Sequence, residues 1–424
     1  MVGFETLLPI AVTVILIALG IEIFVALGLG SALLLQMTEV LPMNLIGLTL
    51  FDGLNAFALI AVPLFILTGD AIVETGLSDK LLDFTQAVFG GFQTGMGTAT
   101  LVGCGLFAAI SGSNASDAAA LGRITLDRLS EQGYTRSYSS ALVASGASTG
   151  ILIPPSISYI IAGLVFGISA SELFKAALIP GIAILAGMIG INLVVNHFRK
   201  FESKDRHPTG HQVVSHIWEA KYGLLIPFII LGGIYSGIFT PTEAAAVAVL
   251  TTMIIGGVIG TIGLADLPVM LERSALVNGV ISPIIAVALL FSQALSALGI
   301  PAALVDVLLG TTSNFYLLTL IMLAMLFVAG AVMETTPNIL VLGPLLLPVA
   351  DRIGMDPVHF TVFFISALAV GFITPPIGLN LYVMAGVSDE PITRIARDAV
   401  PFMIAMLIII LLIAWVPSLS LWAV

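Results

Sequence analysis

Apolar runs long enough to cross a membrane follow one another along almost the whole chain. A helix that spans the bilayer needs about 20 mostly apolar residues. The stretches that fit this length are 4–20, 23–37, 52–77, 137–166, 175–197, 223–239, 242–262, 276–299, 358–387 and 398–417. Only 9% of the 424 residues are charged, whereas a soluble domain is typically about 25% charged. The sequence therefore predicts an all-α integral membrane protein with little mass outside the bilayer.

Two further apolar regions are interrupted at their centres by small and polar residues. They are 93–127, with "ISGSNASDAAALG" in its middle, and 313–350, with "VAGAVMETTPNIL". Irregular backbone at membrane depth is tolerated only where protein or a water-filled cavity covers it. We therefore expect each region to form a re-entrant helical hairpin, which enters and leaves the membrane on the same face.

Adjacent prolines interrupt two of the predicted spans at matching places. The segments are "STGILIPPSISY" within 137–166 and "VGFITPPIGLNLY" within 358–387, and in each a glycine (Gly150 or Gly371) precedes the Pro-Pro pair at the same spacing. Each proline removes a backbone donor and clashes with the preceding turn. A broken helix leaves free carbonyls, which suit a hard cation such as sodium, and free amides, which suit an anion.

The positions of Lys and Arg predict the orientation in the membrane. If the N-terminus lies outside and each hairpin counts as no crossing, twelve of the 14 Lys and Arg residues fall inside. Only Lys175 and Arg352 then fall outside, as the positive-inside rule requires. This count predicts that both termini are periplasmic, that the first hairpin opens to the cytoplasm and that the second opens to the periplasm.

The same order of elements then occurs twice. The first repeat is 1–196, the second is 223–424, and the polar stretch 197–222 is the predicted cytoplasmic linker. Each repeat has three spans, a hairpin, a Pro-Pro-broken span and a closing span, and the two broken spans run in opposite directions. In secondary transporters, substrate and ion sites lie where such inverted-topology repeats meet. The sequence therefore predicts a transporter with its sites at the hairpin tips and the broken helices.

Several other function classes lack the residues that they need. The single cysteine, Cys104, excludes an internal disulfide framework and a cysteine-based metal site. The chain has neither the HExxH motif of a zinc protease nor the GxxxxGK[ST] motif of an ATPase, and we expect no enzyme activity. No basic patch supports a nucleic-acid partner. The histidines in and beside 197–222 have no regular ligand spacing, so we expect no metal other than sodium.

Small polar residues gather at the hairpin tips and the breaks. Their hydroxyl groups suit sodium, but small polar residues also hold membrane helices together. For any single hydroxyl group, a role in helix packing is therefore as good an explanation as a role in binding sodium. Asp117 and Glu334 lie at the two tips, and an ionisable residue within the membrane marks a candidate functional site. Whether either carboxyl group contacts cargo stays open at this point.

Four segments carry a resemblance to a known family, and in order they cover essentially the whole chain. They are "AISGSNASDAAALG", "GYTRSYSSALVASGASTGILIPPS", "GIFTPTEAAAVA" and "GFITPPIGLNLYV". They resemble the signature segments of the large membrane subunit of tripartite ATP-independent periplasmic (TRAP) transporters. The resemblance implies an elevator-type fold, in which a transport domain with both hairpins moves against a scaffold. It also implies sodium-driven uptake of a small organic acid across the bacterial cytoplasmic (inner) membrane.

The resemblance further implies partners. Besides membrane lipid and the small-molecule cargo, they are a small four-span membrane subunit, expected as a separate polypeptide, and a periplasmic substrate-binding protein. Two alternatives stay open. One is a self-sufficient ion-coupled carboxylate transporter of the same broad fold, and the other is a membrane scaffold or channel component. A channel would need a continuous polar lining, whereas the polar residues here gather at two points.

Individual residue roles also follow from the resemblance. The first sodium site would use Ser111, Asn114, Gly150, Ile153 and Pro155, and the second would use Gly330, Gly371, Thr374 and Ile377. Many of these contacts would come from main-chain carbonyls, so apolar residues can contribute. The polar residues that are candidates for cargo binding are Ser113, Asp117, Thr336 and Asn380. Family members often carry a small residue at the position of Asp117.

Overall fold

The computed structural model describes residues 3–91, 94–202, 210–263 and 265–424. Within these ranges the regular structure is helical, and no strand occurs. Seven helices of the described part are long and apolar enough to cross a membrane, judged by length and composition. The all-α integral membrane class that the composition predicts is confirmed.

The helix bounds show how the predicted spans and hairpins are divided. In chain order the α-helices are α1 (Phe4–Ala18), α2 (Ile23–Thr38), α3 (Met43–Leu54), α4 (Ala61–Glu74), α5 (Leu77–Phe89), α6 (Gly95–Ser111), α7 (Asn114–Glu131), α8 (Arg136–Ala147), α9 (Ile157–Phe166), α10 (Ala170–Arg199), α11 (Gly210–Tyr235), α12 (Pro241–Ile259), α13 (Leu267–Ala297), α14 (Ile300–Thr311), α15 (Phe315–Val332), α16 (Thr335–Arg352), α17 (Pro357–Gly371), α18 (Leu379–Ser388) and α19 (Ile392–Trp415). Three short 3₁₀ turns, η1 (Phe57–Ile60), η2 (Ser148–Ile151) and η3 (Pro417–Leu419), complete the list.

Two helical hairpins stand where the polar interruptions predict them. The first is α6 and α7, joined at Gly112 and Ser113, and the second is α15 and α16, joined at Met333 and Glu334. Gly112 has φ +64°, in the left-handed region that side chains other than glycine rarely adopt. A Cβ atom there would also lie 3.1 Å from the carbonyl oxygen of Pro155. The first tip therefore needs glycine for its turn and for its close approach to the break.

Both Pro-Pro segments end a helix. After α8 the chain makes the η2 turn and passes through Pro154 and Pro155 before α9 begins. After α17 it passes through Pro375 and Pro376 before α18 begins. Neither proline can donate a backbone hydrogen bond, and the helix cannot continue through the pair.

The two halves of the chain interlock at these breaks. Helix α18 packs against α7 and α8, and α9 packs against α16 and α17. The second part of each broken helix therefore lies against the hairpin and the broken helix of the other half. Matching residues have a constant offset, since Gly150 and Gly371 are 221 positions apart, as are Pro154 and Pro375.

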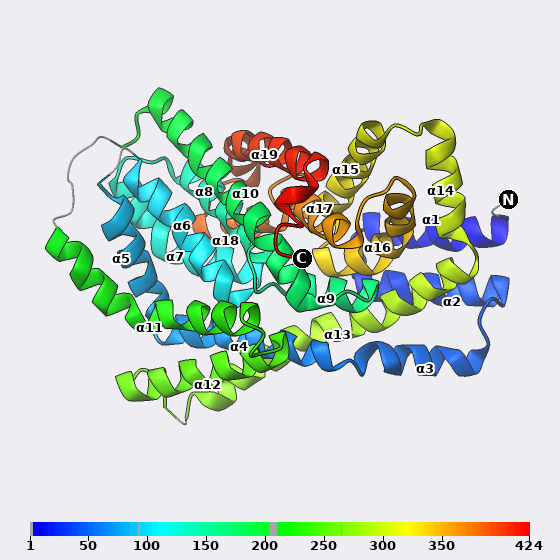
Figure 1. The fold of residues 1–424 in the computed structure, drawn as a ribbon, viewed down its shortest axis with the longest axis horizontal. Helices are drawn as coiled ribbons and strands as arrows, with labels where there is room; N and C mark the ends of the chain where they lie inside the picture. The colour runs from blue at the N-terminus through cyan, green and yellow to red at the C-terminus, as the bar shows by residue number, and fades with distance from the viewer. Residues whose placement is uncertain (1–2, 92–93, 203–209, 264) are drawn as a thin grey trace.

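The two hairpins and the two broken helices together form the centre of the molecule. A row of helices, the supporting row, packs against this centre from one side. Figure 1 shows α12, α4, α13 and α3 along one edge, and each contacts the next in this order. Helices α4 and α13 of this row pack against α6 and α16 of the two hairpins. On α11, α12 and α13, large apolar side chains such as Phe228, Val258 and Leu276 are exposed. Such surface is typical of contact with lipid or with another membrane protein.

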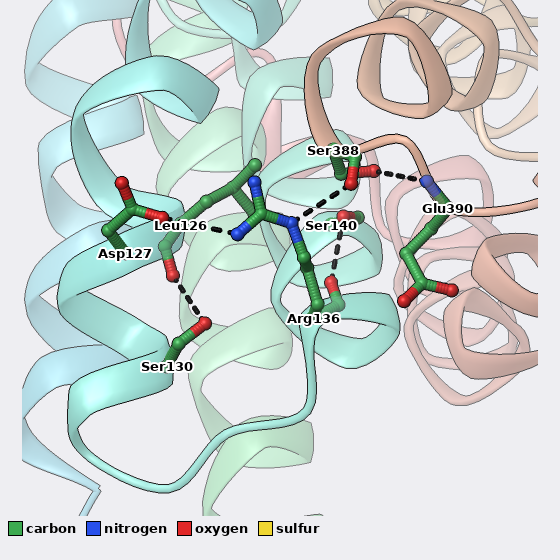
Figure 2. Close-up of polar contacts among 7 residues, drawn as sticks. All are labelled: Leu126, Asp127, Ser130, Arg136, Ser140, Ser388 and Glu390. Carbon is green, nitrogen blue, oxygen red and sulfur yellow. Dashed lines mark hydrogen bonds and ion pairs between the residues drawn. The ribbon is translucent and has the colours of Figure 1, made fainter.

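Arg136 ties three elements of the centre together. It is the first residue of α8, and its Nε atom donates to the carbonyl of Ser388 at the end of α18 (2.9 Å). Its Nη1 atom donates to Asp127 Oδ1 of α7 (3.2 Å), as Figure 2 shows. Ser137 Oγ also donates to Asp398 Oδ2 of α19 (2.9 Å). The first hairpin and both broken helices are thus joined at one end by side chains.

Some elements differ from the sequence-based spans. The short helices α3, α5 and α14 have 12 or 13 residues, so a search for runs of about 20 apolar residues does not separate them. Helix α13 begins at Leu267 and not near 276. In the predicted linker 197–222, α10 continues to Arg199 and α11 already begins at Gly210, while 203–209 lie outside the described residues. The division into two repeats and a linker stays a prediction.

Candidate functional site

The first hairpin tip lies directly against the first break. A Cβ atom on Gly150 would lie 2.6 Å from Asp117 Oδ2 and 2.8 Å from the Asn114 amide nitrogen. Real Cβ contacts are essentially never this short, so a side chain at position 150 would push the tip away. The Ile157 amide also donates to the Gly112 carbonyl (3.4 Å). Glycine at position 150 therefore lets the backbone of the break touch the tip.

The second half repeats this contact. A Cβ atom on Gly371 would overlap the carbonyl group of Gly330 and lie 2.5 Å from the Ala331 amide nitrogen. The Ile377 amide donates to the Ala331 carbonyl (3.2 Å), so here too an amide after the break bonds to a carbonyl near the hairpin tip. The structure therefore brings the predicted second-site residues Gly330, Gly371 and Ile377 together.

Polar side chains gather inside the first tip. Ser111 Oγ donates to Asp117 Oδ1, and the Ser113 amide donates to Ser111 Oγ (3.2 Å). Asp117 is fully buried, and among the described residues no donor reaches its Oδ2 atom. The carboxylate thus has one oxygen in the tip network and another beside Gly150.

Asn380 connects the second break to the first half. Its Nδ2 atom donates to the Ala144 carbonyl (2.9 Å) and to Ser148 Oγ (3.3 Å), both before the first break. Its Oδ1 atom accepts from Asn114 Nδ2 of the first tip (3.2 Å). One side chain therefore contacts a tip and a broken helix of the other half of the chain, where the sequence predicts that the two repeats meet.

The remaining residues of the two predicted sodium sites lie close to these contacts. Ile153 is buried against Ala108 and Ala109 of α6, and the Pro155 carbonyl faces Gly112. Thr374 donates its hydroxyl to the Val370 carbonyl (2.8 Å), which leaves lone pairs of its oxygen free. All nine residues proposed for sodium therefore lie at the two tip–break contacts or beside them, and their roles toward an ion stay predictions.

The four cargo candidates do not share one environment. Ser113 lines a cavity, whereas Asp117, Thr336 and Asn380 are buried and are not among the residues that line it. Thr336 is next to Thr335, whose Oγ1 atom has no hydrogen-bond partner among the described residues. Their contacts with cargo stay predictions.

The cavity measures about 550 Å³ and reaches the first tip. At the tip it is lined by Ser111, Ser113 and Ser116, and Gly69 of α4 also lines it. A Cβ atom on Gly69 would lie 3.3 Å from Ser111 Cβ, so α4 touches the tip at this point. A cavity of this size fits a small ligand.

Charged residues also line this cavity. Arg273 of α13 forms an ion pair with Glu74 of α4 (2.6 Å). Arg123 of α7, Asp79 of α5 and Asp70 of α4 also line it.

A buried carboxyl group anchors the base of the first hairpin. Glu202 accepts hydrogen bonds from the Met96 amide (3.0 Å) and from the Tyr134 hydroxyl (3.0 Å). Asn196 holds the backbone of Glu202 through two further bonds. Burial raises the pKa of the Glu202 carboxyl above its ordinary value of 4.5, because desolvation disfavours the charged form. The start of the 197–222 stretch is therefore attached to the first hairpin.

Several residues at the centre were not predicted as site residues. The carbonyl of Ala144 and the hydroxyl of Ser148 bind Asn380, which only the tertiary contact reveals. Asn338 is fully buried near the second tip, and its Nδ2 atom donates to the carbonyls of Ala329, Met333 and Glu334. The 221-residue offset could have found it, because it relates Asn338 to Asp117.

The atoms that could coordinate an ion at the two contacts are oxygens. Carbonyl, hydroxyl, amide and carboxylate oxygens suit a hard cation, and unwound backbone carbonyls coordinate sodium in transporters of this kind. Among the described residues, no group of three or more His, Cys, Asp or Glu side chains could hold a metal ion. The residues at the two contacts therefore fit sodium better than a transition metal.

Comparison with known proteins identifies the family. Residues 10–419 match the model of the "Tripartite ATP-independent periplasmic transporter, DctM component". The C4-dicarboxylate TRAP transporter large permease protein DctM of Rhodobacter capsulatus is 34% identical over 98% of each chain. The isethionate TRAP transporter permease protein DctMQ of Oleidesulfovibrio alaskensis is 31% identical over 96% of this chain and 64% of that protein. This chain thus spans nearly all of one relative and about two thirds of the other.

A solved structure shares the fold. The YdaH transporter of Alcanivorax borkumensis, whose crystal structure has an unusual topology, superposes with a TM-score of 0.64. The alignment covers 99% of this chain and 98% of that chain at 14% sequence identity. The relatives are permease subunits and not enzymes, and the apolar helices of this chain agree with a multi-pass inner-membrane protein. The chain therefore belongs to the family of DctM components, the large membrane subunits of TRAP transporters.

Proposed function

We propose that this chain is the sodium-coupled transport subunit through which a TRAP system imports a small organic acid. One observation carries the proposal: each hairpin tip packs by its backbone against the Pro-Pro break of its own half. At both contacts, glycines let the tip approach the break closely, beside segments that cannot form regular helix. A sodium ion is the ligand that oxygens in such an arrangement would bind.

The cargo is proposed to be a small acid. The two relatives are named for isethionate and for C4-dicarboxylates, and both names denote small anions. The cavity of about 550 Å³ at the first tip offers hydroxyl groups and the Arg123 side chain. Ser113 is the cargo candidate best placed to meet a ligand there, and Thr336 and Asn380 would act from the buried side of the tips.

An elevator movement is the proposed mechanism. The unit that moves would contain both hairpins and both broken helices. Arg136 and Asn380 join the first hairpin to both broken helices by side-chain bonds, and the second tip packs against the second break at Gly371. The supporting row, which includes α4, would stay fixed, and the first tip would slide past Gly69 of α4. Each sodium site lies within one half of the moving unit, so the ions would travel with the cargo.

The proposed partners are a small membrane subunit and a periplasmic substrate-binding protein. The Rhodobacter capsulatus relative is named as a large permease protein of a TRAP transporter, which agrees with a small counterpart. Exposed apolar side chains on α11 to α13, such as Phe228 and Val258, offer the surface for that subunit or for lipid. Most of this chain lies in apolar helices, and capture of cargo is assigned to the binding protein.

Transport assays in liposomes test this proposal. The chain with its small subunit should take up cargo only when the binding protein is present outside and a sodium gradient points inward. Replacing sodium with potassium should stop uptake. Uptake by the chain alone would favour a self-sufficient transporter of the same fold, and uptake without any sodium dependence would refute the coupling.

A further inference from the structure

The free oxygen of Asp117 points to a role that differs from cargo binding. Asp117 is fully buried and does not line the cavity at the first tip. Its Oδ1 atom accepts from Ser111, and its Oδ2 atom lies beside Gly150 without a donor among the described residues. A buried polar oxygen without a partner is costly, and a buried carboxylate needs a compensating charge.

The neighbours of this oxygen include the residues that are proposed for the first sodium ion. Gly150, Asn114 and Ser111 all lie at the same tip–break contact as Asp117. No Lys or Arg forms an ion pair with Asp117 in the described part of the chain. A cation held between the tip and the break would supply the missing charge.

The second half shows that the fold itself does not require a charge at this position. The residue 221 positions later is Asn338, which is equally buried in the first turn of α16. Its Nδ2 atom donates to the carbonyls of Ala329, Met333 and Glu334. Its Oδ1 atom, like Asp117 Oδ2, has no partner among the described residues. An uncharged side chain thus serves the same place in the other hairpin.

We propose that Asp117 Oδ2 is a direct, negatively charged ligand of the cation bound between the first tip and the first break. This inference rests on the proposed sodium coupling and assigns Asp117 to the ion and not to cargo. It also makes the two ion sites unequal, because the first contains a carboxylate and the second contains a neutral amide. The first site should bind sodium more tightly than the second.

Asp117→Asn tests the inference with little disturbance of shape. The amide keeps an oxygen that can accept from Ser111, but it removes the negative charge. Glu131→Gln is the matched control, since Glu131 is an exposed acidic residue at the end of the same helix. The first measurement is the unfolding temperature of the purified full chain as sodium replaces choline at constant ionic strength, without cargo. The second is cargo uptake in the liposome assay.

Four outcomes separate the explanations. The inference expects that Asp117→Asn unfolds at a higher temperature than wild type without sodium, because a buried unpaired charge is gone. It also expects at least a tenfold rise in the sodium concentration that gives half of the stabilisation, while Glu131→Gln matches wild type. A wild-type sodium response in Asp117→Asn, with a higher cargo concentration for half-maximal uptake, would instead assign Asp117 to cargo. Lower stability with an unchanged sodium response would mean a structural role.

The fourth outcome concerns the proposed function. If wild-type chain shows no stabilisation by sodium at all, the sodium coupling fails, and the assignment of Asp117 fails with it. If wild type responds to sodium but Asp117→Asn responds equally, only the inference about Asp117 is overturned. The two failures are therefore distinguishable in one titration.

Discussion

Gly371→Ala tests how closely the second tip approaches the second break. Gly371 ends α17 and has no positive φ, so the backbone at this position accepts alanine. The added methyl group would overlap the Gly330 carbonyl and lie 2.5 Å from the Ala331 amide nitrogen. These neighbours are backbone atoms and cannot rotate away as a flexible side chain can. The tip must therefore move away from the break.

Two terms set how much Gly371→Ala should destabilise the chain. Forcing an extra methyl group into a well-packed interior costs about 1–3 kcal/mol. Displacing the tip also breaks the bond from the Ile377 amide to the Ala331 carbonyl, which contributes about 0.5–1.5 kcal/mol. We expect Gly371→Ala to lower the free energy of unfolding by about 2–4 kcal/mol. Gly386→Ala in α18 is the control, since no atom lies within 4 Å of its Cβ position.

Thermal unfolding of the purified chain, with and without sodium, measures both variants. Gly371→Ala should unfold at a lower temperature and lose part of the stabilisation that sodium gives. Gly386→Ala should be as stable as wild type or slightly more stable, because alanine favours helix over glycine by about 0.5–1 kcal/mol. If Gly371→Ala unfolded and responded to sodium as wild type does, the tight contact between tip and break would be wrong.

Three further predictions concern the ends of the moving unit and the ion sites. Arg136→Ala should slow uptake and destabilise the chain by about 1.5–3 kcal/mol, as expected for a charged hydrogen-bonding group. Unfolding and uptake assays check both effects, and an unchanged uptake rate would show that the bonds of Arg136 do not hold the proposed moving unit together. The raised pKa of Glu202 means that the folded state binds the proton more tightly than the unfolded state does. The free energy of unfolding should therefore fall as pH rises from 4.5 through the folded pKa. Glu202→Gln should flatten this slope when unfolding is measured across pH, and a slope equal to that of wild type would exclude Glu202 as its source. Thr374→Ala should raise the sodium concentration for half-maximal uptake, and Thr374→Ser, which keeps the hydroxyl, should do so less; identical sodium curves would return Thr374 to a packing role.

The backbone features of the centre could be predicted because they follow from residue chemistry alone. Proline pairs cannot continue a helix, so the breaks at 154–155 and 375–376 are fixed by the sequence wherever the helices pack. Polar and small residues within apolar runs likewise predicted both hairpin turns. The approach of Gly150 and Gly371 to the tips was implied by the family resemblance, and the structure shows the steric reason for glycine.

Tertiary contacts account for what the sequence did not show. Helix α5 is amphipathic and buries Leu77, Leu81 and Leu82, and its charged residues prevented its recognition as an apolar run. The bonds of Asn380 to Ala144 and Ser148 join residues more than 230 positions apart. No local pattern predicts such partners. Asp117 was a cargo candidate because it lies at a tip, and only its burial away from the cavity separates it from that role.

The two breaks have matching sequences but different surroundings. Pro154 and Pro155 are buried, whereas Pro375, Pro376 and Ile377 are exposed, with Ile377 at 41%. Such a difference agrees with alternating access, in which one repeat is gated against the other. In the proposed mechanism, the cavity at Ser113 and the buried first break belong to one end state. The opposite end state would cover the second break and close the cavity, and Gly69 of α4 is the point on the supporting row that the first tip must leave.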